Sequence, residues 1–76
     1  MAKQAKSAGR TKLKLFRVKR LLTQEQFAEK LGFSRGHYAR LESGEQDVTL
    51  RFLQAFETAF GVDFDEAKKL TKRDDE

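Results

Sequence analysis

The stretch LTQEQFAEKLGFSRGHYARLE (residues 22–42) decides the fold of this chain, because it holds two helical patterns separated by a turn. Thr23 is followed three residues later by Gln26, which is the spacing of a capping box at a helix N-terminus. We therefore expect a first helix over residues 24–31. Gly32 comes directly after it, and glycine is the residue best able to adopt the left-handed conformation that ends a helix.

The second helix of the pair is expected over residues 35–42, after Ser34 as its N-cap. Two helices that cross steeply need a small residue at their closest approach, which Ala28 supplies, and a turn that tolerates positive φ, which Gly32 supplies. Apolar residues should point into the angle between the helices, and these are Phe27, Leu31, Phe33, Tyr38 and Leu41. The spacing therefore predicts a helix-turn-helix.

Three further helices are expected around this motif. Residues 11–21 carry apolar side chains on more than one face, so their periodicity predicts a helix without settling which side is buried. Thr49 is the N-cap of an expected fourth helix that Gly61 ends, and residues 65–70 form a short fifth. The phenylalanines of the fourth helix are candidates for the core, and some of them could instead form a dimer surface: Phe52, Phe56 and Phe60.

The fold class predicted is all-α, a compact five-helix domain over residues 11–70. Residues 1–10 are polar and aperiodic, and we expect them to form a disordered basic arm with a weak electrostatic role. Residues 71–76 are expected to form an acidic tail that frays.

The charges are unevenly distributed along the 76 residues, whose formal net charge is +4. No acidic residue precedes Glu25, whereas the acids gather late and close the chain as Asp74, Asp75 and Glu76. A basic half suggests a polyanionic partner on one face, although a solvated charged surface explains the same pattern. Cysteine is absent, and no apolar run approaches the roughly 20 residues of a membrane span, so we expect a soluble, cytoplasmic protein.

The residues that enzymes and metal sites need are scarce. The single histidine, His37, has no partner ligands for a metal, and Asp63 and Asp65 lack the glycine and glutamate that would complete a calcium loop. No glycine-rich phosphate loop or carboxylate pair is present either. We therefore expect no enzyme activity, no metal and no cofactor.

The segment from Leu13 to about Phe64 resembles the phage repressor and Cro family, also called the Xre or lambda-repressor-like family. The resemblance is carried by LTQEQFAEKLGFSRGHYARLESGE (residues 22–45) and TLRFLQAFETAFGV (residues 49–62). It implies sequence-specific binding to double-stranded DNA by a transcription regulator, in most relatives a homodimer on a near-palindromic operator. Two departures concern loops: many relatives have a proline before the fourth helix, and many have glycine or asparagine where this chain has Leu21.

The resemblance also implies roles for single residues. Gln24 matches a glutamine that bonds a DNA phosphate and braces the recognition helix, and Arg17 and Glu42 match a pair that joins the first helix to the end of the third. Arginine can donate two hydrogen bonds to guanine, which suits base reading. The implied DNA-contact residues are Gln24, Ser34, Arg35, Gly36, His37, Arg40 and Ser43.

Two alternatives to a repressor stay open. Domains of this family also act as antitoxins or as protein-interaction modules, so the main partner could be a protein such as a toxin. A basic amphipathic first helix on a membrane surface is less favoured, because the segment lacks the strong separation of apolar and charged faces that such helices need.

Overall fold

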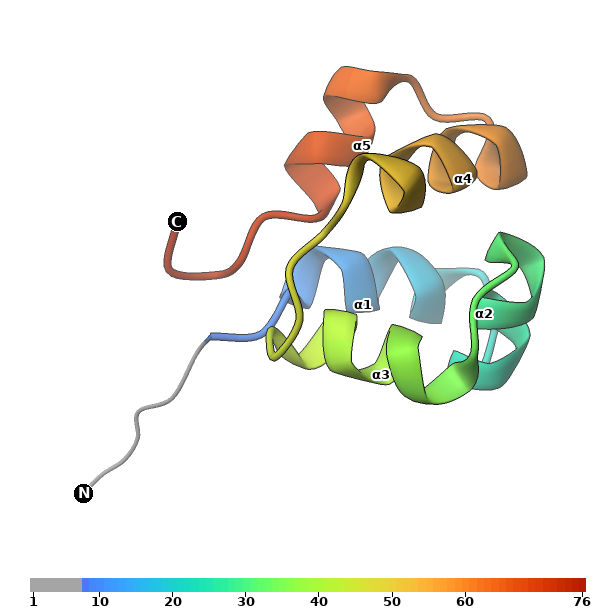
Figure 1. Cartoon of the computed structure of the whole chain (residues 1–76), viewed down its shortest axis with the longest axis horizontal. Coiled ribbons are helices and arrows are strands. Elements are labelled where there is room, and N and C mark those ends of the chain that lie inside the picture. The colour runs from blue at the N-terminus through green and yellow to red at the C-terminus, as the bar shows by residue number, and fades with distance from the viewer. Residues whose placement is uncertain (1–7) are drawn as a thin grey trace.

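The computed structural model describes residues 8–76, and it contains five helices and no strand within that range. The expected arm falls mostly on residues 1–7, which lie outside the described residues, but its last residue, Arg10, is buried and hydrogen-bonded and is not disordered as we expected. The helices are α1 (Thr11–Lys19), α2 (Gln24–Leu31), α3 (Arg35–Ser43), α4 (Leu50–Phe60) and α5 (Phe64–Leu70). Figure 1 shows α1, α2 and α3 forming one layer, with α4 and α5 above it.

Four of the five helices begin with the same side-chain cap. The N-cap residues Thr23, Ser34, Thr49 and Asp63 each accept a hydrogen bond from the backbone N–H three residues on. Thr23 also completes the expected capping box, because its own N–H donates to Gln26 Oε1 at 2.9 Å. These local bonds explain why the starts of the helices can be predicted so closely.

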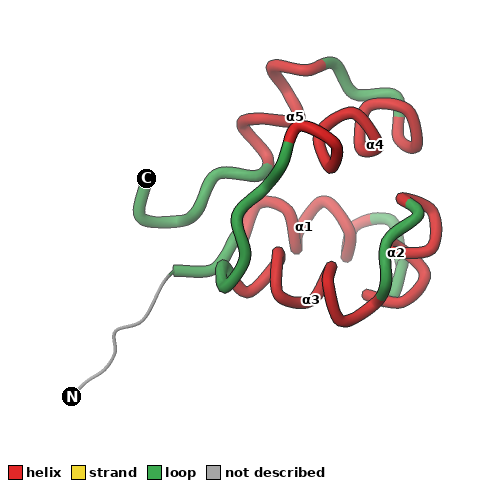
Figure 2. Tube along the Cα trace, in the orientation of Figure 1, coloured by secondary structure: helices red, strands yellow, loops and turns green. Residues whose placement is uncertain are grey.

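The first helix is shorter than we expected, since it ends at Lys19 and not at Leu21. Leu21 is the one non-glycine residue with positive φ (59°) in residues 8–76, and this left-handed conformation turns the chain toward α2. The tube in Figure 2 shows the short connection that results. The first and last residues of the other four helices agree with expectation to within one residue.

The core is aromatic and lies between the two layers. Its fully buried side chains come from every helix, and the largest are Leu13, Phe27, Tyr38, Leu41, Phe52 and Phe56. Phe60 is half-buried and stacks on Phe27 with 4.6 Å between ring centroids. The phenylalanines of α4 therefore build the core, and the dimer surface that we considered for them is not supported. The buried side of α1 is the one with Leu13, whereas Leu15 and Val18 are exposed.

The two ends of the described chain are tied together. We expected residues 71–76 to fray, yet Asp74 accepts hydrogen bonds from the backbone N–H and the hydroxyl of Thr11, and its own N–H donates to Gly9 O at 2.9 Å. The carboxylate of Asp74 thereby supplies the side-chain cap that Arg10 does not give to α1. Within residues 8–76 no helix has the length and apolar character needed to cross a membrane.

Candidate nucleic-acid interface

The angle between α2 and α3 is made by Gly32 and its neighbours. Gly32 lies in the left-handed region (φ 80°), and Phe33 N donates to Ala28 O at 2.9 Å, so the chain leaves α2 through a tight C-terminal motif. Ala28 is 1% exposed, which leaves no room for a larger side chain where the helices meet. The turn sets the direction of α3, whose inner face is anchored by Tyr38 and Leu41, both fully buried.

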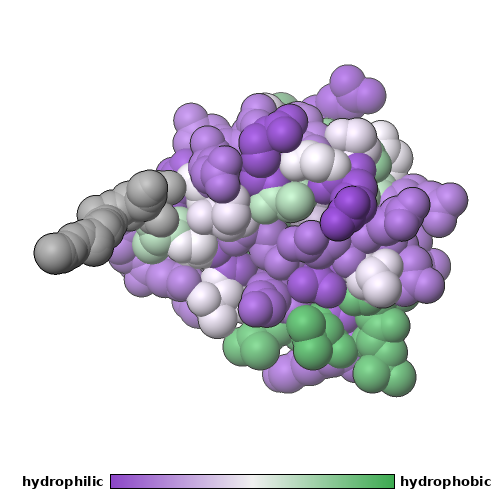
Figure 3. All heavy atoms as spheres, turned by 90° about the horizontal axis from the view of Figure 1, so that it is seen from below, coloured by the Kyte–Doolittle hydropathy of each residue, from purple (hydrophilic) through white to green (hydrophobic). Residues whose placement is uncertain are grey.

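The outer face of α3 is open to solvent. Arg35, Gly36, Arg40 and Ser43 are exposed, as is the N-cap Ser34, and His37 is half-buried with its ring 5.1 Å from that of Phe33. Figure 3 views the molecule from below Figure 1, the side on which α3 lies, and shows a surface that is mostly hydrophilic with an apolar group at one edge. The residues implied for DNA contact are thus accessible, apart from the partly covered Gln24 and His37.

Gly36 and Arg40 lie one helical turn apart on this face. Arg40 Nε donates to Gln46 Oε1 at 3.1 Å, which ties the recognition helix to the loop after it. A Cβ placed on Gly36 would meet only Arg40 Nη1, at 3.6 Å, an ordinary van der Waals contact. The protein therefore has space for alanine at this position, and its own packing does not require glycine.

Three side chains donate to the carboxylate of Glu42, which is 7% exposed, and together they brace α3 against α1 and α2. Arg17 donates to both carboxylate oxygens, at 2.8 and 3.1 Å, so the expected pair is present. Burial alone would raise the pKa of Glu42, but hydrogen bonds from Arg17, Tyr38 and Gln24 hold it below its ordinary value. Burial and the bond to Glu42 also raise the pKa of Tyr38.

Gln24 and Ser43, two of the implied DNA-contact residues, are engaged within the protein. Gln24 Nε2 donates to Glu42 Oε1 at 3.0 Å, and this bond braces the recognition helix as the resemblance implies. Gln24 also lines a shallow hollow at the start of α2, together with Arg17, Thr23, Glu25 and Arg35. Ser43 Oγ bonds locally, at 3.1 Å to Arg40 O and 3.0 Å to Glu45 Oε2.

Sequence reasoning missed Arg10, which supports the C-terminal end of α3. This residue is 3% exposed, and its guanidinium donates to the carbonyls of Leu41, Gln46 and Thr71. Arg73, from the tail, donates to Gly44 O at 3.1 Å and holds the same loop from the other side. Neither residue stands out in the sequence, because both lie among other charged residues near the ends of the chain.

Across residues 8–76, no cluster of three or more histidine, cysteine, aspartate or glutamate side chains could hold a metal ion. The exposed face of α3 instead presents the cations Arg35 and Arg40, which suit contact with phosphates and base edges.

Residues 13–66, more than half of the chain, match the family described as helix-turn-helix (HTH_3). The match covers both helices of the motif, the loop after them and α4, together with most of α1 and the start of α5. No curated protein and no solved structure gives a significant match to the chain.

Proposed function

Because this chain belongs to the helix-turn-helix family of the Xre/Cro type and is a DNA-binding protein, we propose that it regulates transcription by reading a specific operator. In this proposal α3 enters a major groove of double-stranded DNA, and Arg35, His37 and Arg40 face the base edges. The observation that carries it is the exposure of Arg35 and Arg40 on a helix whose opposite side is fixed by buried residues. A rigid helix can hold an arginine in the geometry that guanine requires.

Backbone contacts would come from residues at the ends of the two helices. The first turn of α2 presents N–H groups and the positive end of the helix dipole, where a phosphate is favoured. Gln24 lines the hollow at this point, and Ser34 lies at the corresponding end of α3. Such contacts fix the register of the protein on DNA without reading its sequence.

We further propose that the protein is a repressor or autoregulator and binds as a homodimer to a near-palindromic site. A two-fold dimer would place two copies of α3 in successive major grooves, about 34 Å apart. Sedimentation of the protein with a single operator duplex tests this part: two chains per duplex are expected, and one chain per duplex would overturn it.

Selection of bound duplexes from a random pool, followed by affinity measurements on selected and random DNA, tests the base-reading roles. Arg35→Ala and Arg40→Ala should each lower discrimination at particular base pairs by about 1–3 kcal/mol. Gln24→Ala should weaken binding to all sequences more evenly. Lys69→Ala, on an exposed position of α5, is the matched control. Equal losses on selected and random DNA for both arginine variants would show that the base-reading assignment is wrong.

A further inference from the structure

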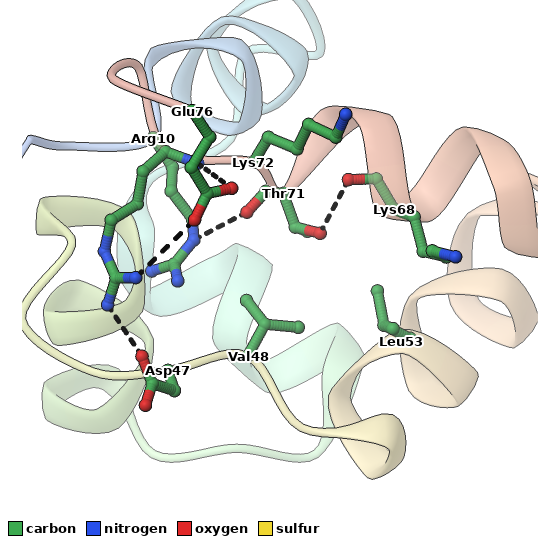
Figure 4. Close-up of a pocket in the computed structure, with 9 residues that line it drawn as sticks. Arg10, Asp47, Val48, Leu53, Lys68, Thr71, Lys72 and Glu76 are labelled. Carbon is green, nitrogen blue, oxygen red and sulfur yellow. Dashed lines mark hydrogen bonds and ion pairs between the residues drawn. The ribbon is translucent and has the colours of Figure 1, made fainter.

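A pocket of about 520 Å³ opens beside the C-terminal end of α3, away from the proposed DNA face. Figure 4 shows it between the loop that carries Asp47 and Val48, the start of α4 and the end of α5. Val48 and Leu53 supply the apolar part of its lining, and Arg10, Lys68 and Lys72 supply cations. Its size falls within the range of small-molecule sites, roughly 300–1,000 Å³.

Arg10 is an unusual residue for such a lining, because it is a cation that is 3% exposed. Nε donates to Thr71 O at 2.7 Å, and Nη1 donates to the carbonyls of Leu41 and Gln46. Nη2, the remaining nitrogen, has no hydrogen-bond partner among residues 8–76. Buried N–H groups are nearly always paired, and leaving charged ones unpaired is costly, so this nitrogen calls for an acceptor.

The acids at the rim do not serve as that acceptor. Asp47 and Glu76 both pair with Arg73, at 2.8 and 3.8 Å, and neither forms an ion pair with Arg10. Arg10, Lys68 and Lys72 therefore line the pocket without a paired carboxylate in the described part of the chain, and Lys68 Nζ lies 5.4 Å from the centroid of the Phe64 ring. Burial and the nearby charge of Arg73 also lower the pKa of Arg10, whereas the charges of Glu76 and Asp47 act in the opposite direction.

We propose that this pocket binds a small oxyanion, a carboxylate or phosphate group, which accepts hydrogen bonds from Arg10 Nη2 and is flanked by Lys68 and Lys72. The apolar lining from Val48 and Leu53 would accommodate a hydrocarbon portion of a larger ligand. The fit is chemical: Arg10 Nη2 is a charged donor, and its hydrogen bond to a carboxylate or phosphate oxygen would be stronger than one between neutral groups.

The pocket is also connected to the recognition helix by hydrogen bonds. Arg10 holds Leu41 O in the last turn of α3 and Gln46 O in the next loop, and Gln46 in turn accepts from Arg40. An anion that binds Arg10 should therefore change operator affinity. This consequence rests on the proposed function, whereas binding of the anion does not.

Titrations of the ¹⁵N-labelled full chain with inorganic phosphate and, separately, acetate test the site, with chloride adjusted to keep ionic strength constant. We expect saturable shifts of the Arg10 side-chain Nε–H signal and of the Val48, Thr71 and Lys72 amides. The anion that binds more tightly identifies the ligand as a phosphate or a carboxylate. Absence of a saturable shift at these groups with both anions would overturn the proposal.

Variants distinguish anion binding in this pocket from nonspecific attraction of anions to the basic surface. Replacing both Lys68 and Lys72 by glutamine should weaken binding about fivefold, whereas Lys69→Gln, on the same helix but outside the pocket, should leave it unchanged. Unchanged binding in the double variant would overturn the proposal. Arg40→Ala should keep the shifts in the pocket while losing operator discrimination, so failure of the DNA assignment and failure of the anion site can be told apart.

Discussion

Tyr38 Oη donates a 2.7 Å hydrogen bond to Glu42 Oε2, one turn further along α3. The same carboxylate accepts two bonds from Arg17 on α1 and one from Gln24 on α2. Glu42 therefore joins the three helices that position the recognition face. Its own charge is compensated by these donors, and Arg17 depends on it as a counter-ion.

Glu42→Gln should destabilise the protein by about 3–5 kcal/mol, because it leaves Arg17 largely buried without its counter-ion. Urea unfolding at neutral pH measures this change in the free energy of unfolding. Glu29→Gln, on an exposed position of α2, is the control and should shift stability by less than about 0.5 kcal/mol. A similarly small loss for Glu42→Gln would contradict the bracing role.

The bracing carboxylate should also make stability dependent on pH. The pKa of Glu42 is lower in the folded protein than its ordinary value of 4.5, so the folded state binds fewer protons there than the unfolded state. Its contribution is complete above the unfolded pKa and is lost as the pH falls through the folded pKa.

The stability difference between the wild type and Glu42→Gln should therefore shrink on acidification from pH 7 through the folded pKa. The pKa values of Asp47 and Asp74 are also lowered, by hydrogen bonds from Arg73 and Thr11. Both residues are present in the wild type and in the variant, so their contributions cancel in the stability difference. A difference that stays constant down to pH 3 would show that Glu42 does not titrate in this way.

The helix-turn-helix could be predicted closely because its signals are local. Thr23 caps its helix through Gln26, three residues away, and Gly32 ends that helix through its own φ. Each signal is contained within one turn of chain, so a single sequence reveals it. The resemblance to relatives added the Arg17–Glu42 pair, whose members lie 25 positions apart.

The contacts of the two ends could not be predicted, because they join residues far apart without any periodic pattern. Arg10 bonds Thr71, 61 positions away, and Asp74 caps α1 from 63 positions away. In the sequence Arg10 resembles its basic neighbours, and only the fold shows that it is buried. The DNA contacts of α3 remain a prediction, since exposure identifies which side chains are available and not which bases they meet.

Leu21→Gly should stabilise the protein by about 1 kcal/mol. A non-glycine residue costs roughly 1–2 kcal/mol in the left-handed region, and the larger backbone entropy that glycine loses on folding offsets part of the gain. Leu21 has φ 59° and its side chain is 90% exposed, so little packing is lost. Thermal and urea unfolding measure the effect. Leu21→Asn should give a smaller gain, and Leu21→Ala, which keeps the strain, should give none. A loss of stability in the glycine variant would mean that the leucine makes a contact that its exposure conceals.

Gly36→Ala should separate the stability of the protein from its binding to DNA. Alanine is favoured over glycine inside a helix by about 1 kcal/mol, and the added Cβ meets only Arg40 Nη1, at an ordinary distance of 3.6 Å. We expect the free energy of unfolding to increase by that amount. If glycine is present so that the recognition helix can approach the base pairs closely, the added methyl group should weaken operator binding by about 1–3 kcal/mol through overpacking.

Urea unfolding and operator affinity are measured on the same preparation of Gly36→Ala. Thr58→Ala, on an exposed position of α4, is the matched control, because it also raises helix propensity and lies outside the recognition face. It should leave operator affinity unchanged. If Gly36→Ala gains stability and binds the operator as tightly as the wild type, close approach at this position is excluded, and the reading of DNA by α3 must rest on Arg35, His37 and Arg40.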